Sequence, residues 1–136
     1  MSRVFIRRAD RSTLAPPGCC VVLRSTGQAA AALGVLGLGV ISTAQEEITV
    51  VAGGLPLPQT FGGGFTRYVA WVFGGGSLRL GITLGRVASN LGGTYAGGLA
   101  SVVPGPLSEI AVTPEPPFTA TLTGPVVLDG SFAFCR

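Results

Sequence analysis

The pattern of apolar and polar positions becomes typical of β-structure from residue 46 onward. Short runs of Val, Ile, Leu, Phe and Thr are separated by Gly and Pro, as in strands joined by turns. Residues 48–51 and 109–113 are predicted short strands, and 118–123 alternates most cleanly, as a half-buried strand does. Asp129-Gly130 is a strong hairpin-turn signal, so the last twenty residues are predicted to form a three-stranded meander.

An internal repeat occupies the middle of the chain. Residues 61–72 and 73–84 both begin FGGG-x-x-R and continue with strand composition. A triple glycine adopts positive φ without steric cost, so each is predicted to reverse the chain. Neither face of the following strands is purely polar, which predicts strands covered on both sides. Phosphate binding is not expected, because the P-loop needs a Lys and the dinucleotide motif needs a following helix.

Residues 25–44 are uncharged and rich in Ala and Gly. They have the length of a membrane-spanning helix, but small and hydroxylated residues make transfer into lipid only weakly favourable. A basic leader and a Ser42-x-Ala44 end also resemble a secretory signal. We favour a buried element of the fold, and a leader, an anchor and a membrane span remain as alternatives.

These patterns predict three regions. Residues 46–136 form a single all-β domain, a sandwich or open barrel of short strands bounded by Gly and Pro. Residues 28–45 form an uncharged segment packed on this core, and residues 1–27 form an extended basic arm. A chain of 136 residues suits one domain with a real core.

Charge is scarce and unevenly placed. Charged residues make up 11% of the chain, against roughly 25% in ordinary soluble domains. A free soluble domain usually carries more charge, so either partner subunits cover much of the surface or part of the chain meets a membrane. The arm carries a net charge of +4 and the rest −1. Because the arm lacks interleaved aromatic residues, we interpret it as a solvated strand that contacts subunits, and we do not expect nucleic acid as a partner.

The residue types argue against catalysis. The chain has no His, which removes the commonest general base and neutral metal ligand. Glu46 and Glu47 are neighbours and would face opposite sides of a strand, so no pair of carboxylates is brought together. We therefore expect no enzymatic activity, no catalytic residues, no metal site and no cofactor.

Cys19, Cys20 and Cys135 are the only cysteines. A disulfide from the arm to Cys135 would tie the ends together and leave one thiol for pairing between subunits. Closing so long a loop would contribute roughly 4–5 kcal/mol in the entropy model. The alternative, favoured in a reducing cytosol, is three reduced and buried cysteines. The spacing does not favour zinc.

A compact β chain with low charge, an extended arm and Gly/Pro-rich turns resembles the small virion proteins of tailed bacteriophages, such as capsid decoration or head and tail accessory proteins. The resemblance implies a non-enzymatic structural subunit, located in the virion, whose partners are copies of itself and neighbouring structural subunits. The alternative is an exported or membrane-anchored envelope protein with residues 25–44 as leader or anchor. The candidate interface residues are Arg3, Arg7, Arg8, Arg11, Phe65, Tyr68 and Trp71.

Overall fold

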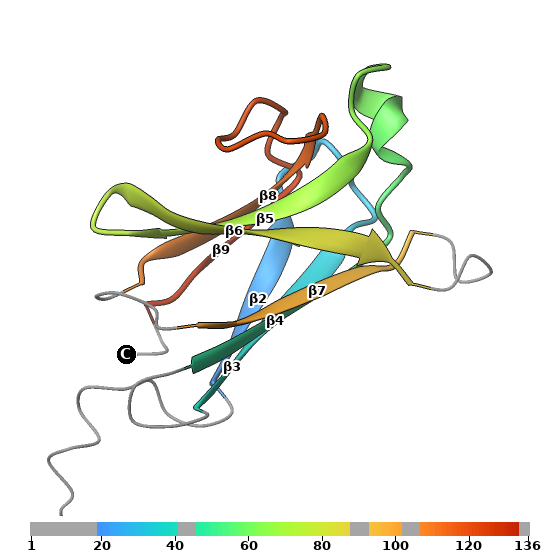
Figure 1. Ribbon diagram of the computed structural model, residues 1–136. Helices are drawn as coiled ribbons and strands as arrows, with labels where there is room; N and C mark the ends of the chain where they lie inside the picture. The colour runs from blue at the N-terminus through green and yellow to red at the C-terminus, as the bar shows by residue number, and fades with distance from the viewer. Residues whose placement is uncertain (1–18, 41–45, 88–92, 102–106, 134–136) are drawn as a thin grey trace, which may run out of the picture.

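The computed structural model describes residues 19–40, 46–87, 93–101 and 107–133 (Figure 1). Within these ranges, eight antiparallel strands close into a barrel in the spatial order β2-β3-β4-β7-β6-β5-β8-β9. The strands are β2 (Cys19–Ser25), β3 (Leu33–Val40), β4 (Glu46–Gly53), β5 (Arg67–Gly74), β6 (Ser77–Arg86), β7 (Tyr95–Ser101), β8 (Glu109–Glu115) and β9 (Leu128–Ser131). A short 3-10 helix, η2 (Pro58–Phe61), precedes β5.

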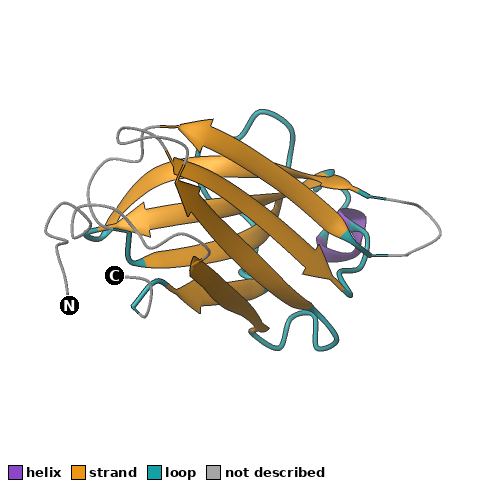
Figure 2. Ribbon diagram, turned by 90° about the horizontal axis from the view of Figure 1, so that it is seen from below, coloured by secondary structure: helices purple, strands orange, loops and turns teal. Residues whose placement is uncertain are grey.

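The all-β class is confirmed, but the sheet closes where a sandwich or an open barrel was expected. Closure depends on β9, which pairs with β8 on one side and with β2 on the other. Strands β5, β6 and β7 follow one another as neighbours, and β8 returns to lie beside β5. The order β8-β5-β6-β7 is that of a Greek key. Figure 2 shows the strands wrapping around the barrel at a common tilt.

Alternate side chains of the strands fill one hydrophobic core. Tyr68 and Tyr95 pack edge to face inside it, with ring centroids 4.9 Å apart. The Tyr68 hydroxyl donates to the carbonyl oxygen of Pro56 at 2.5 Å. Burial, together with Tyr95, raises the pKa of the Tyr68 phenol above its ordinary value. The largest fully buried aliphatic and aromatic residues are Tyr68, Phe132, Leu23, Leu36, Leu38, Ile48, Ile110 and Leu128.

The barrel begins earlier in the chain than the predicted boundary at residue 46, because β2 and β3 are two of its strands. The glycine-rich composition of β3 has a packing reason at Gly34. A Cβ there would lie 3.0 Å from the carbonyl oxygen of Val51 and 3.1 Å from the side chain of Leu23. Among the described residues, no helix is long and apolar enough to cross a membrane.

The two FGGG motifs have different structures. The second joins β5 to β6 through Gly75 and Gly76, whose φ angles are 61° and 81°. A two-residue loop with positive φ at both positions matches the twist of an antiparallel hairpin, so this predicted turn is confirmed. The first motif begins at Phe61, the last residue of η2, and leads into β5 without joining two paired strands, so the predicted strand-to-strand turn is wrong there.

The predicted C-terminal meander is also wrong. Residues 116–127 form a loop, and Asp129-Gly130 lies inside β9. Gly130 serves close packing, since a Cβ there would lie 2.9 Å from the side chains of Leu23 and Val21. The anchor of loop 116–127 is a side chain, the buried carboxylate of Glu115, which accepts hydrogen bonds from the amides of Thr123 and Gly124.

Candidate interaction surfaces

The outer surface of β2, β3, β4 and β7 carries a row of apolar side chains. Val22 pairs with Val35, Val35 with Val51, and Val51 with Ala96. Residues directly opposite one another in a sheet are neighbours in space, so the four form a continuous stripe. The three valines are 48%, 43% and 45% exposed, and Leu33, two residues before Val35, is 59% exposed. We call Val22, Val35, Val51 and Ala96 the valine row.

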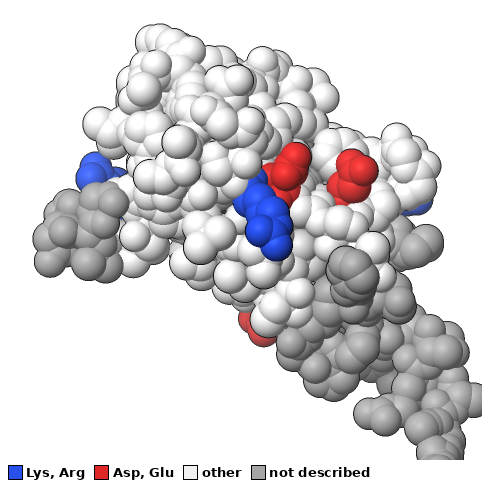
Figure 3. Space-filling model, turned by 180° about the vertical axis from the view of Figure 1, so that it is seen from behind, with Lys and Arg blue, Asp and Glu red and all other residues white. Residues whose placement is uncertain are grey.

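The valine row has outward neighbours on two sides. On one side they are Cys20, Gly37, Thr49 and Gly98, which are uncharged and also paired in register, and on the other side Leu33 is paired with Arg24 and Gly53. Figure 3 shows the charged groups of one face as a few separate spots on a largely uncharged surface. An apolar sheet face with little charge is suited to contact with another protein.

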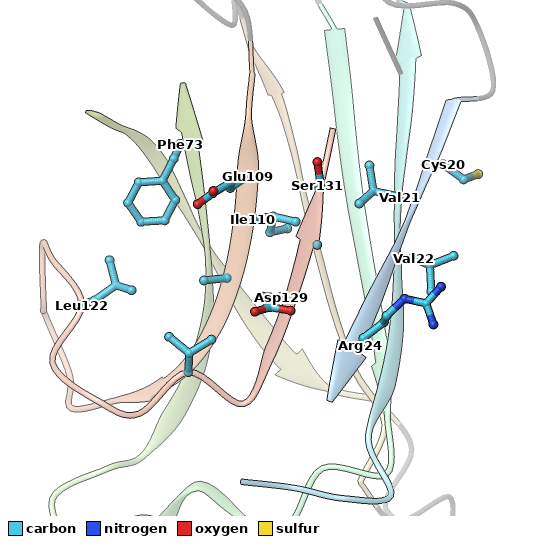
Figure 4. A pocket seen from close by; sticks show the side chains of 13 residues that line it. Cys20, Val21, Val22, Arg24, Phe73, Glu109, Ile110, Leu122, Asp129 and Ser131 are labelled. Carbon is cyan, nitrogen blue, oxygen red and sulfur yellow. The ribbon is translucent and has the colours of Figure 1, made fainter. Parts of the chain in front are cut away.

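A groove with a volume of about 750 Å³ lies on the other side of Val22, across the outer surface of β8 and β9 (Figure 4). Phe73 and Leu122 stand at one side, and Val22 and Arg24 at the opposite side (Figure 4). Its other outward-facing lining residues are Cys20, Glu109, Ala111, Val126, Asp129 and Ser131.

The charged groups of the groove are open to a partner. Glu109 and Asp129 are exposed carboxylates, and Arg24 faces them from β2. Within the described part of the chain, no ion pair or side-chain hydrogen bond engages any of these three residues. The groove therefore combines apolar walls with acceptors that remain available for hydrogen bonding.

A buried polar network covers the outer surface of β5 and β8. Trp71 Nε1 donates to Thr113 Oγ1 at 2.8 Å, and the Thr113 hydroxyl donates to Glu115 Oε2 at 2.5 Å. Trp71 is only 3% exposed, and Thr113 and Glu115 are fully buried. A buried carboxylate is tolerated only when hydrogen bonds replace its water, and here the chain supplies them.

Glu115 clamps the start of loop 116–127 to its end. The Thr123 amide donates to Oε2 at 2.9 Å, the Thr123 hydroxyl donates to Oε1 at 2.5 Å, and the Gly124 amide donates to Oε2 at 3.2 Å. Burial by itself raises the pKa of Glu115, but the hydrogen bonds from Thr113, Thr123 and Gly124 outweigh it and hold the pKa below its usual value. The carboxylate is therefore charged at neutral pH.

Arg67 fixes the tip of the same loop. Its Nε donates to the Pro116 carbonyl oxygen at 3.2 Å and its Nη2 to the Thr119 carbonyl oxygen at 3.4 Å. Between these two contacts stands Phe118, which is 100% exposed and has a φ of 61°. Positive φ is unusual for a residue other than glycine, and a fully exposed Phe side chain gains nothing from the fold.

The predicted interface residues differ in how far the structure buries them. Tyr68 is enclosed in the core and Trp71 in the outer network, so neither side chain is presented to a partner. Phe65 is half-buried beside Gly62. The arm residues Arg3, Arg7, Arg8 and Arg11 lie outside the described residues.

The predicted disulfide stays a prediction, since Cys135 lies outside the described residues and only Cys20 has a described, exposed side chain. In the described part of the chain, no group of three or more His, Cys, Asp or Glu residues could hold a metal ion. Composition pointed to neither the valine row nor Phe118. The valine row depends on the pairing register of distant strands. The exposure of Phe118 depends on contacts from Arg67, which is also distant in the sequence.

The geometry defines a small antiparallel β-barrel protein with an apolar outer row and no described metal cluster. The model of one protein family, YoqH, described as an SPbeta prophage-derived uncharacterized protein, matches residues 15–136. The match covers most of the chain, which therefore belongs to this family, and its prophage-derived character indicates phage origin. No curated protein and no solved structure matches the chain.

Proposed function

We propose that this protein is a non-enzymatic structural subunit of a phage particle, acting as a capsid decoration protein or as a head or tail accessory protein. The observation that carries the proposal is the valine row, which exposes in-register apolar side chains on four neighbouring strands. Covering the exposed half of each Val side chain would contribute about 1 kcal/mol. Long-lived subunit interfaces are more apolar than free surfaces, so such a row suits permanent assembly.

Two further observations support the proposal. The family is prophage-derived, which agrees with a role in a phage. The sequence is only 11% charged, so the protein has little of the surface charge that keeps free domains apart. Its partners would be copies of itself and neighbouring structural subunits, and its location the virion.

The alternative, an exported or anchored envelope protein with residues 25–44 as leader or anchor, is less well supported. Cleavage after Ala44 would remove β2 and β3, two of the eight described strands. It would leave β4 without β3 and β9 without β2, so each strand would lose one of its two partners and the barrel would be open there. A folded barrel therefore needs the segment that a leader would discard.

The test combines the intact mass of the native protein with its particle size in solution. We expect a chain that retains β2 and β3, in species larger than a monomer. Val35→Lys should shift the population toward smaller species, because it places a charge in the middle of the valine row. Val87→Lys is the matched control, since Val87 is 44% exposed and lies outside the row. A chain that starts near residue 45 and runs as a monomer would overturn the proposal.

A further inference from the structure

Phe118 is fully exposed, and its backbone is strained. Its side chain is 100% exposed and its φ is 61°, a conformation that costs a non-glycine residue of order 1 kcal/mol or more. A strained residue with no packing of its own persists only when surrounding contacts determine its conformation. Contacts elsewhere in the loop must therefore hold Phe118 in this exposed conformation, and the exposed ring can contact another molecule.

The loop supplies the cause. Arg67 holds the carbonyl oxygens of Pro116 and Thr119 on either side of the ring, and the Thr119 hydroxyl donates to Pro116 at 2.9 Å. Glu115 fastens the far end of the loop at Thr123. Phe118 is thus held outward by contacts that order its neighbours, which lowers the entropic cost of docking it.

The backbone at the tip is also open to a ligand. Within the described part of the chain, the amides of Phe118, Thr119 and Ala120 donate to no acceptor. Successive amides beside a residue with positive φ form a concave donor surface that suits a carboxylate. The tip therefore offers an aromatic ring next to free N–H donors.

The groove over β8 and β9 has the complementary chemistry. Phe73, Leu122 and Val126 give it apolar walls, and Glu109 and Asp129 are exposed acceptors without a described partner. Its volume of about 750 Å³ is within the range of pockets that take small organic groups. Phe118 does not line the groove of its own chain, so its ring is available to another molecule.

We propose that Phe118 of one copy inserts into the groove of a second copy, with the tip amides donating to Glu109 and Asp129. This rests on the proposed function and deepens it by naming a contact. The contact joins two different surfaces. In a bound pair, the copy that inserts Phe118 keeps a free groove, and the copy that receives it keeps a free Phe118. Contacts of this kind propagate into closed rings or open filaments.

The experiment begins with two single variants. Phe118→Ser removes the ring, and Ser131→Arg fills the groove from an exposed position opposite Glu109. Sedimentation of the full chain across a concentration series should show association weakened roughly thirtyfold by either change, as expected for a buried aromatic anchor. Leu57→Ser is the matched control, because Leu57 is 52% exposed and lines neither the groove nor the valine row. Circular dichroism should show that all three remain folded.

A mixing experiment then tests the pairing itself. Both variants are made with Val35→Lys, which removes the contribution of the valine row. Phe118→Ser keeps a working groove and Ser131→Arg keeps a working ring, so the mixture should form one-to-one pairs while each variant alone stays monomeric. Absence of pairs in the mixture would overturn the inference.

The wild-type result separates the two proposals. Equal assembly of the wild-type protein and Phe118→Ser would overturn the inference and leave the proposed function standing. A wild-type protein that remains monomeric at every concentration overturns both.

Discussion

The barrel has two apolar outer surfaces, one over β5 and β8 and one over β3 and β4. Their side chains differ in how far they are buried. On β5 both faces are shielded: Tyr68, Ala70 and Val72 face the core, and Val69 and Trp71 are covered from outside. On β3 the burial alternates, so that Leu36 and Leu38 are buried while Leu33 and Val35 are exposed.

One loop of the chain lies on only one of these two sides. Residues 116–127 connect β8 to β9, and Glu115 fastens the end of this loop. Figure 1 shows the loop lying beside β8 and β5, away from β3 and β4. One apolar outer face therefore has a loop of the same chain beside it, and the other face is exposed.

Trp71→Ala should give the largest loss of stability on the covered side. The ring fills the space that Gly81 leaves, where a Cβ would lie 2.9 Å from it, and its N–H bonds Thr113. We expect the free energy of unfolding to fall by about 4 kcal/mol, measured by urea denaturation. If Trp71→Ala weakened assembly without changing that free energy, Trp71 would belong to an interface and the two sides would not differ as described.

Glu115→Gln should come next. Glu115 accepts from Thr113 and Gly124 through Oε2 and from the Thr123 hydroxyl through Oε1, and the NH2 group of Gln cannot accept the bonds made to the oxygen that it replaces. We expect a loss of about 3 kcal/mol and faster amide hydrogen exchange in loop 116–127. Glu109→Gln is the control because Glu109 is exposed, and it should change stability by less than about 0.5 kcal/mol. Equal effects of the two changes would contradict the clamp.

Low pH should reduce the stability that the Glu115 carboxylate contributes to the fold. The pKa of Glu115 is lower in the folded protein than its usual value, so the ionised carboxylate stabilises the fold. This contribution is complete above the unfolded-state pKa and is lost as the pH falls through the lower folded-state pKa. The difference in stability between wild type and Glu115→Gln should therefore shrink between neutral and strongly acidic pH. A difference that stays constant would contradict a charged Glu115.

Phe118→Gly should have a smaller effect of opposite sign. Glycine adopts positive φ freely, and the exposed ring contributes no packing to the isolated chain. We expect the monomer to gain up to about 1 kcal/mol of stability in thermal unfolding, while association falls. A loss of stability would show that the ring packs within its own molecule.

The sequence predicted the all-β class and the turn between β5 and β6, but it did not predict the closure of the sheet. Gly75-Gly76 specified a hairpin because the φ requirement is local. Residues 118–123 alternate like a strand, yet Glu115 captures the amides of Thr123 and Gly124 that strand pairing would use. The aromatic residues Tyr68 and Trp71 looked suited to an interface, but composition does not reveal which apolar residues the chain itself covers.

The valine row and the exposed ring of Phe118 could not be predicted, because each depends on contacts between residues that are far apart in the sequence. Val22 and Val35 become neighbours of Val51 only through the register of three strands. Phe118 is exposed because Arg67, from β5, holds the backbone on both sides of it.

The four-residue strand β9 also determines when this chain finishes folding. Because β9 pairs with β2, and Thr26 bonds the carbonyl oxygen of Val126 at 2.6 Å, closure joins segments 100 residues apart. During synthesis, β2 and β8 would carry unpaired edges until Leu128–Ser131 leave the ribosome. Such edges readily pair with other chains. Ribosomal pausing before residue 128 should therefore favour aggregation of nascent chains, whereas rapid release should favour the barrel.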